Sequence, residues 1–151
     1  MLVLYVGPSS SHLLDLKFSR RLGPHSEVLW HEGYADSRLG RLLGARGVAI
    51  RFGGGLGGIR AESFGGSVGV VGFEGDPFLW EFVVELLPFR EVHVRLRPGF
   101  MDFGVLGKLV VVADEVELGD VSCSICGRRP GRIEGGDGLI YCGKCWAKEG
   151  R

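Results

Sequence analysis

The 151-residue chain contains no asparagine, no glutamine and no threonine. Amide side chains hydrolyse on heating, and proteins from hyperthermophiles use few of them. Arginine outnumbers lysine by fourteen to four, and glycine occupies 27 positions. High-GC codon usage accounts for the excess of arginine and glycine, but it does not readily explain the loss of threonine. We therefore expect a thermophilic prokaryote, with an archaeon as the first choice.

Further absences narrow the functional classes. With 18 basic and 18 acidic residues, net charge neither predicts nor excludes an anionic partner. Without Asn or Gln, the usual adenine readers, base recognition would depend on other side chains or on the backbone. No stretch approaches the roughly 20 apolar residues that span a bilayer, so no membrane partner is expected. Residues 1–7 lack a basic leader and a cleavage site, which predicts a first strand and a cytoplasmic location.

Along residues 1–118, short apolar segments typical of strands alternate with segments of helical periodicity. This order predicts an α/β fold with a mixed sheet and flanking helices. No helix is expected between 91 and 118, so the sheet should end in antiparallel strands, and a boundary at Gly119 separates a finger over 119–151. The expected elements are strands at 2–6, 27–31, 48–52, 68–73, 91–97 and 106–112, which 114–118 could extend, and helices after Ser11, at 35–45 and at 76–88.

The four cysteines lie in two CxxC pairs, Cys123 with Cys126 and Cys142 with Cys145, and fifteen residues separate the pairs. Two intervening residues allow one tight turn to direct both sulfurs at a single ion, and this spacing is typical of structural zinc sites. Four thiolates leave no open coordination position, so the ion would be structural. Disulfides are the alternative, because hyperthermophile cytosols tolerate them and four cysteines allow three connectivities.

The residues between the pairs suit a hairpin, and WAKEG after Cys145 suits a short helix. This order of knuckle, hairpin and ligands at a helix start resembles the treble-clef class of C4 zinc fingers over about residues 123–150. The resemblance implies that the four cysteines are the ligands of one zinc ion. It implies no function, because treble clefs contact DNA, RNA or protein or serve structure alone. The short final helix leaves a zinc ribbon open.

If the first four strands are parallel, the loops that follow them meet at one edge of the sheet, where open α/β sheets bind ligands. This predicts a nucleotide- or phosphate-binding pocket, with an enzyme as one reading. The alternatives to a pocket are structural. Polar residues could accumulate in these loops by chance, the serines could form an N-cap before the first helix, and the glycine run could be a flexible turn. The pocket candidates are Ser9, Ser10, Ser11, His12, His31, Glu32, Gly55 and Glu74.

Basic residues form two groups that could follow a phosphate backbone. Over residues 91–97 they alternate with apolar residues, which predicts a half-exposed strand. The first hypothesis for function is therefore contact with nucleic acid, namely RNA or a nucleoprotein complex. The alternative is that the basic residues only protect a sheet edge. The candidates are Arg95 and Arg97 on the strand and Arg128, Arg129, Arg132 and Lys144 on the finger.

The helix expected over 76–88 is very apolar, with Asp76 and Pro77 at its start. A third hypothesis is therefore a protein-interaction subunit, in which this helix is partly buried against a protein partner or in a homo-oligomer.

Overall fold

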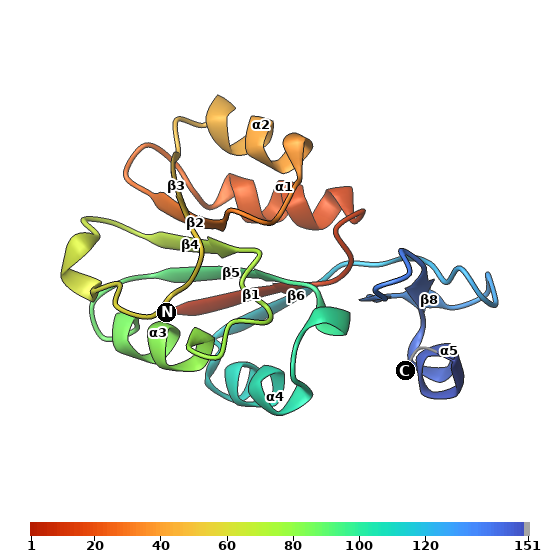
Figure 1. Ribbon diagram of the computed structural model, residues 1–151. Coiled ribbons are helices and arrows are strands. Elements are labelled where there is room, and N and C mark those ends of the chain that lie inside the picture. The colour runs from red at the N-terminus through yellow and green to blue at the C-terminus, as the bar shows by residue number, and fades with distance from the viewer. Residues whose placement is uncertain (150–151) are drawn as a thin grey trace.

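A computed structural model describes residues 1–149 and shows an α/β fold built on one six-stranded sheet (Figure 1). The strand order is β3-β2-β4-β5-β1-β6, and every pairing in this sheet is parallel. The predicted α/β fold is confirmed. The strands are β1 (Leu2–Val6), β2 (Glu27–His31), β3 (Ala49–Gly53), β4 (Val68–Val71), β5 (Val92–Leu96) and β6 (Glu115–Leu118).

Helices cover both faces of the sheet, which explains why its central strands are apolar on both sides (Figure 1). On one face, α1 (His12–Arg20) and α2 (Ser37–Ala45) pack on a core that includes Val3 and Tyr5. On the other face, α3 (Leu79–Leu86) and α4 (Phe103–Val112) pack on a core that includes Leu2 and Leu4. Among residues 1–149, no helix is long and apolar enough to cross a bilayer.

The prediction of a strand at 106–112 is wrong, because these residues belong to α4. Asp102 caps this helix and accepts hydrogen bonds from the backbone amides of Gly104 and Val105. A run of apolar residues is ambiguous between strand and helix, and here the cap decides. The helix provides the crossover that parallel strands require, so β6 joins the sheet parallel to β1 and the expected antiparallel ending is also wrong.

The prediction that residues 91–97 form a half-exposed strand is wrong as well. Strand β5 lies between β4 and β1, and all five of its residues are buried. Its polar side chains face the α1 side of the sheet, where the His93 ring is bonded to the hydroxyl of Tyr5 at 2.8 Å and to Glu91 at 2.7 Å. Burial lowers the pKa of His93, although the hydrogen bond to Glu91 opposes the shift.

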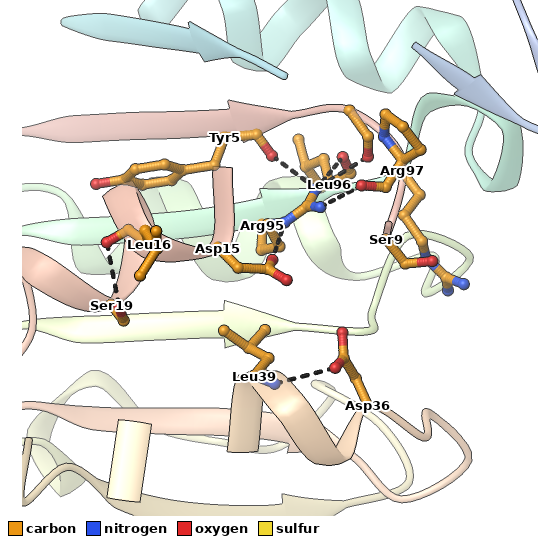
Figure 2. A network of polar contacts seen from close by, with 12 residues as sticks. Tyr5, Ser9, Asp15, Leu16, Ser19, Asp36, Leu39, Arg95, Leu96 and Arg97 are labelled. Atoms are coloured by element: carbon orange, nitrogen blue, oxygen red, sulfur yellow. Dashed lines mark hydrogen bonds and ion pairs between the residues drawn. The ribbon is translucent and has the colours of Figure 1, made fainter. Parts of the chain in front are cut away.

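Arg95 is buried at 2% exposure and organises the loop that joins β1 to α1 (Figure 2). Its Nε donates to Asp15 on α1 at 3.0 Å, and its Nη1 donates to the carbonyl of Gly7 at 2.9 Å. Further bonds reach the carbonyls of Pro8, Tyr5 and Leu96. A buried guanidinium needs such partners, and in return it fixes the course of a loop that has little regular hydrogen bonding of its own.

Connections from neighbouring strands diverge between β2 and β4. From β2 the chain passes through α2 to the outer strand β3, whereas from β4 it passes through α3, on the opposite face, to β5. A divergence of this kind opens a crevice at the carboxyl ends of the strands. The topology therefore positions a candidate ligand site there.

Replacing Arg95 with methionine should lower the free energy of unfolding by about 3–5 kcal/mol, because Asp15 would keep a buried charge without its partner. Guanidinium denaturation of the wild type and the variant measures the loss. The exposed Arg41→Met change on α2 is the control and should cost less than about 0.5 kcal/mol. An equal, small effect of the two changes would contradict the role given to Arg95.

Candidate functional site

The four cysteines form a cluster in which the Sγ atoms all lie within 4.8 Å of one another. Cys123 and Cys126 come from the turn between β7 (Val121–Ser122) and β8 (Pro130–Gly131), and Cys142 and Cys145 lie at the start of α5 (Gly143–Glu149). All four thiols are free. The Sγ atoms of Cys126 and Cys142 are 4.0 Å apart, far beyond a disulfide bond.

The cluster fits one tetrahedral metal ion. Zinc–sulfur bonds of about 2.3 Å place the sulfurs of a tetrahedral site about 3.8 Å apart, close to the spacing observed. Backbone amides support two of the sulfurs, since Cys142 N donates to Cys123 Sγ at 3.2 Å and Cys145 N donates to Cys142 Sγ at 3.5 Å. Gly127, at a φ of +63°, makes the turn that follows the first pair. The four cysteines are positioned to bind one metal ion.

The thiols of the cluster differ in their pKa values. Burial raises the pKa of Cys123, but backbone hydrogen bonds at Cys126, Cys142 and Ile125 outweigh it and lower the pKa to about 6. Burial and the neighbouring sulfurs raise the pKa of Cys145 to about 12. Four thiolates at this spacing repel one another, so complete ionisation requires a cation among them.

The elements around the cluster follow the predicted order. The β7–β8 turn is succeeded by a hairpin of β9 (Ile133–Glu134) and β10 (Ile140–Tyr141), and α5 then begins beside the second cysteine pair. Tyr141 and Trp146 pack edge to face at 5.4 Å between ring centroids. Residues 119–149, called the finger below, thus have a small core of cysteines and aromatic rings.

The finger lies at the carboxyl edge of the sheet (Figure 1), and Glu134 attaches it there. Glu134 Oε1 accepts two hydrogen bonds from Ser9, from the amide at 2.7 Å and from the hydroxyl at 2.6 Å. The backbone of Glu134 also packs against Gly99 in the 3-10 helix η2 (Pro98–Phe100), with no room for a side chain at Gly99. Ser9 lies in the loop that Arg95 holds, so the finger and the sheet meet at a fixed point.

A cavity of about 670 Å³ opens at this edge, at the divergence between β2 and β4. A volume of this size is within the range of sites for small molecules. Loops after all five strands from β1 to β5 contribute to its wall, and the finger adds one residue. The lining residues are Ser9, His31, Gly33, Tyr34, Ala35, Gly54, Gly72, Phe73, Gly75, Asp76, Pro77, Arg97, Phe100 and Glu134.

Arg97 is the cation of this cavity, and four groups restrain it. Its Nε and Nη2 donate to Glu74, at 2.8 and 3.2 Å, and Glu74 is itself buried. The guanidinium lies 4.5 Å from the ring centroid of Tyr34 and 4.1 Å from that of Phe100. Its Nη1 is 4.0 Å from Glu134 of the finger. The guanidinium is therefore preorganised, with Nη1 as the nitrogen that Glu74 does not engage.

Two other polar groups of the wall are also oriented. His31 Nδ1 accepts a hydrogen bond from the amide of Gly33 at 2.9 Å, which makes Nε2 the proton donor of the neutral ring. Asp76 accepts from the amides of Phe78, at 2.8 Å, and Leu56, at 2.9 Å, so it ties the glycine-rich loop after β3 to the start of α3. Asp76 thus fixes a turn rather than capping the helix directly, since α3 begins at Leu79.

The predicted pocket residues divide into three groups. Ser9 and His31 line the cavity, and Glu74 lies behind Arg97. Glu32 and Gly55 lie next to the wall, beside Gly54 and Asp76 respectively. The others, Ser10, Ser11 and His12, are not part of the lining, and Ser11 is the buried N-cap residue of α1, although its hydroxyl makes no capping bond.

Sequence reasoning missed Tyr34, Phe100 and Glu134, and it assigned Arg97 to a different surface. The rule that loops after parallel strands meet at one edge would have placed Arg97 correctly. The alternation of polar and apolar residues in β5 instead indicated an exposed strand. Glu134 carried no signal, since its contact with Ser9 spans 125 residues of sequence.

The basic residues proposed to contact nucleic acid lie in different places. Arg95 is in the interior and Arg97 is in the cavity wall, as described above. Arg132 lies 3.5 Å from Asp120. Arg128, Arg129 and Lys144 are exposed on the finger, and none of them has an ion pair among the described residues. The basic strand and the basic finger therefore do not form one continuous surface.

Comparison with known protein families gave no match, and no curated protein matches the chain.

The cysteine cluster should bind one metal ion per purified chain, measured by mass spectrometry of the metal content. Cys142→Ser should abolish stoichiometric binding and change the fluorescence of Trp146, which packs on Tyr141 beside the cluster. The far-ultraviolet circular dichroism of the sheet and its helices should persist, because both large cores lie outside the finger. Ser122→Ala, at an exposed position of β7, is the control. Protein without metal and without titratable thiols would contradict the assignment.

Proposed function

We propose that the chain binds a small polar ligand of nucleoside size in the cavity at the carboxyl edge of the sheet. The observation that carries the proposal is the position of the cavity, about 670 Å³ in volume, at the divergence between β2 and β4. Ligands of open α/β sheets bind at such points. Tyr34, Phe73 and Phe100 offer apolar and aromatic surface, and Ser9, His31 and Arg97 offer polar atoms, as a planar base with an attached sugar requires.

The charges around the cavity favour a neutral or cationic ligand over a polyphosphate. Glu74, Asp76 and Glu134 outnumber Arg97, and Glu74 already forms a two-point pair with the guanidinium. The amide and hydroxyl of Ser9, which could hold a phosphate, donate instead to Glu134. A nucleoside can donate hydroxyl and amino hydrogens to these carboxylates, whereas a triphosphate would meet their repulsion.

The finger serves this site as a structural part. We propose that its ion is zinc, since four thiolates in tetrahedral arrangement suit it and leave no open coordination position for chemistry. The order of turn, hairpin and helix supports a treble-clef finger. Glu134, which the hairpin carries, closes one side of the cavity, so the role of the ion is to hold that wall in place.

Binding can be tested by thermal shift with adenosine, guanosine, cytidine and uridine and with their 5′-triphosphates. At about 100 times its Kd a ligand stabilises by roughly 2.7 kcal/mol, which raises the Tm of a chain of this size by about 5–10 °C. At least one nucleoside should do so, and its triphosphate should act more weakly. Gly75→Leu should remove the shift, because its side chain would occupy the rim, where the nearest atom is 4.0 Å from the added Cβ.

Gly65→Leu is the matched control, since nothing lies within 4 Å of an added Cβ at this exposed position outside the cavity wall. It should leave the shift intact. The absence of any shift with the nucleosides, or equal shifts in the Gly75→Leu variant, would refute the site. A stronger effect of the triphosphates would refute the charge argument.

Contact of the finger with nucleic acid is the second candidate. Arg128 and Arg129 favour it, because they are adjacent, exposed and without ion pairs among the residues that the structure describes. Guanidinium groups of this kind follow phosphates. The finger carries almost as many acidic as basic side chains, and for this reason the candidate ranks below the cavity.

Fluorescence anisotropy with a labelled single-stranded RNA at low salt tests this candidate. Arg128→Ala/Arg129→Ala should weaken binding about tenfold or more and flatten its salt dependence, because two phosphate contacts are lost. The pair Arg38→Ala/Arg41→Ala on α2 is the control. No binding at 50 mM salt, or equal losses in both double variants, would exclude a role for the finger.

A further inference from the structure

The two carboxylate oxygens of Glu134 have different surroundings. Oε1 accepts hydrogen bonds from the amide and the hydroxyl of Ser9, at 2.7 and 2.6 Å. Oε2 lies 4.0 Å from Nη1 of Arg97, the guanidinium nitrogen that Glu74 does not engage. The side chains of Glu134 and Arg97 are only 15% and 16% exposed, so little water competes for these atoms. The carboxylate therefore lies among three donors at the cavity wall.

Three donors of this kind form an anion site. Backbone amides, hydroxyls and guanidinium nitrogens are the groups with which proteins hold phosphates and carboxylates. Ser9 follows β1 and Arg97 follows the adjacent strand β5, so both lie at the same end of the sheet (Figure 2). Arg95 fixes the loop that carries Ser9. Glu74 fixes the guanidinium of Arg97. The sheet thus holds the donors, and the finger supplies Glu134 as the anion that occupies them.

The gap between Nη1 of Arg97 and Oε2 of Glu134 fits one hydroxyl group. A distance of 4.0 Å is too long for a hydrogen bond between the two atoms. Within residues 1–149, neither atom has a hydrogen-bond partner. A hydroxyl oxygen placed about 2.8 Å from both can accept from Nη1 and donate to Oε2, as a bridging water does. A doubly ionised phosphate ester has no hydrogen to donate, and its charge would repel that of Glu134.

The other two carboxylates near the cavity are engaged on both oxygens. Glu74 pairs with Arg97 through both of its oxygens, at 2.8 and 3.2 Å. Each oxygen of Asp76 accepts a hydrogen bond from a backbone amide. Glu134 differs, because its Oε2 has no donor among the described residues and lies beside Arg97 at the cavity wall. Of the three acids, Glu134 is therefore the one with an unbonded oxygen to offer a ligand.

We propose that Arg97 and Glu134 bind one hydroxyl of the ligand between them, and that Glu134 excludes the phosphate ester of that hydroxyl. This role, which rests on the proposed function, narrows the ligand to a nucleoside whose hydroxyl is free. Oε1 occupies the donors of Ser9 that a phosphate would need, and the charge on the carboxylate repels a phosphate that approaches Arg97. Glu134 thus determines the specificity of the site, and the finger adds selectivity to a cavity built mainly by the sheet.

Inorganic phosphate tests the anion site without a nucleoside. Glu134→Ala frees the amide and hydroxyl of Ser9 together with Nη1 of Arg97, so these donors can hold the ion. At equal ionic strength, about 20 mM phosphate should raise the Tm of this variant by about 2–4 °C more than that of the wild type. Glu85→Ala removes the same charge at an exposed position of α3 outside the cavity wall, and it should respond like the wild type. Ser9→Ala/Glu134→Ala should respond less than Glu134→Ala, because one donor is lost.

Glu134→Gln gives a second readout and keeps the contact between the finger and the sheet. The amide oxygen can accept both bonds from Ser9, and the amide nitrogen then takes the position of Oε2 as a donor. The affinity for a 3′- or 5′-monophosphate, relative to that for its nucleoside, should rise about 100-fold in this variant, because a unit charge about 5 Å away is removed. Isothermal titration calorimetry with the four nucleosides and these monophosphates measures the change. Glu85→Gln is the matched control and should leave the preference unchanged.

The outcomes separate the role of Glu134 from the proposed function. No response of Glu134→Ala to phosphate, or an equal response of the wild type, would overturn the anion site whether or not a nucleoside binds. An unchanged preference in Glu134→Gln, or the same gain in Glu85→Gln, would overturn the selectivity. If the wild type binds no nucleoside while Glu134→Ala still responds to phosphate, the proposed function and the hydroxyl contact fail and the anion site stands.

Discussion

The buried guanidinium of Arg95 is the contact on which the arrangement of the site depends. It joins β5 to α1 through Asp15 and fixes the β1–α1 loop through the carbonyls of Gly7 and Pro8. The loop presents Ser9, and Ser9 binds Glu134 of the finger. One charged group in the core of the sheet thus determines where a separate small unit docks, 125 residues further along the chain from Ser9.

The finger and the sheet both contribute to the wall of the cavity. The hairpin beside the cysteine cluster carries Glu134, and Glu134 lies at the wall of the cavity near Arg97. Arg97 in turn is held by Glu74 and by two aromatic rings, so the wall is rigid before any ligand arrives. Preorganisation of this kind reduces the entropy lost on binding.

Patterns of local origin were predicted well. The strands β1, β2 and β4, the helices α1 and α2 and the cysteine cluster follow from runs of apolar residues, helical periodicity and CxxC spacing. Errors arose where one pattern fits two environments. The run at 106–112 suits a strand or a helix, and the capping bonds of Asp102 select the helix. Alternation in β5 suits a strand at the surface, but it also suits an interior strand whose polar groups find buried partners.

The sequence by itself determined the α/β class and two CxxC pairs suited to one metal ion, because apolar periodicity and CxxC spacing depend on neighbours within a few residues. Only the tertiary structure decided that His93 and Arg95 are buried, that Arg97 faces the cavity and that Glu134 closes it. Those outcomes depend on the order of strands in the sheet and on contacts between distant segments. Such contacts leave no periodic pattern in the sequence. They form because a buried charge or polar group needs a partner, and that partner can come from a distant segment of the chain.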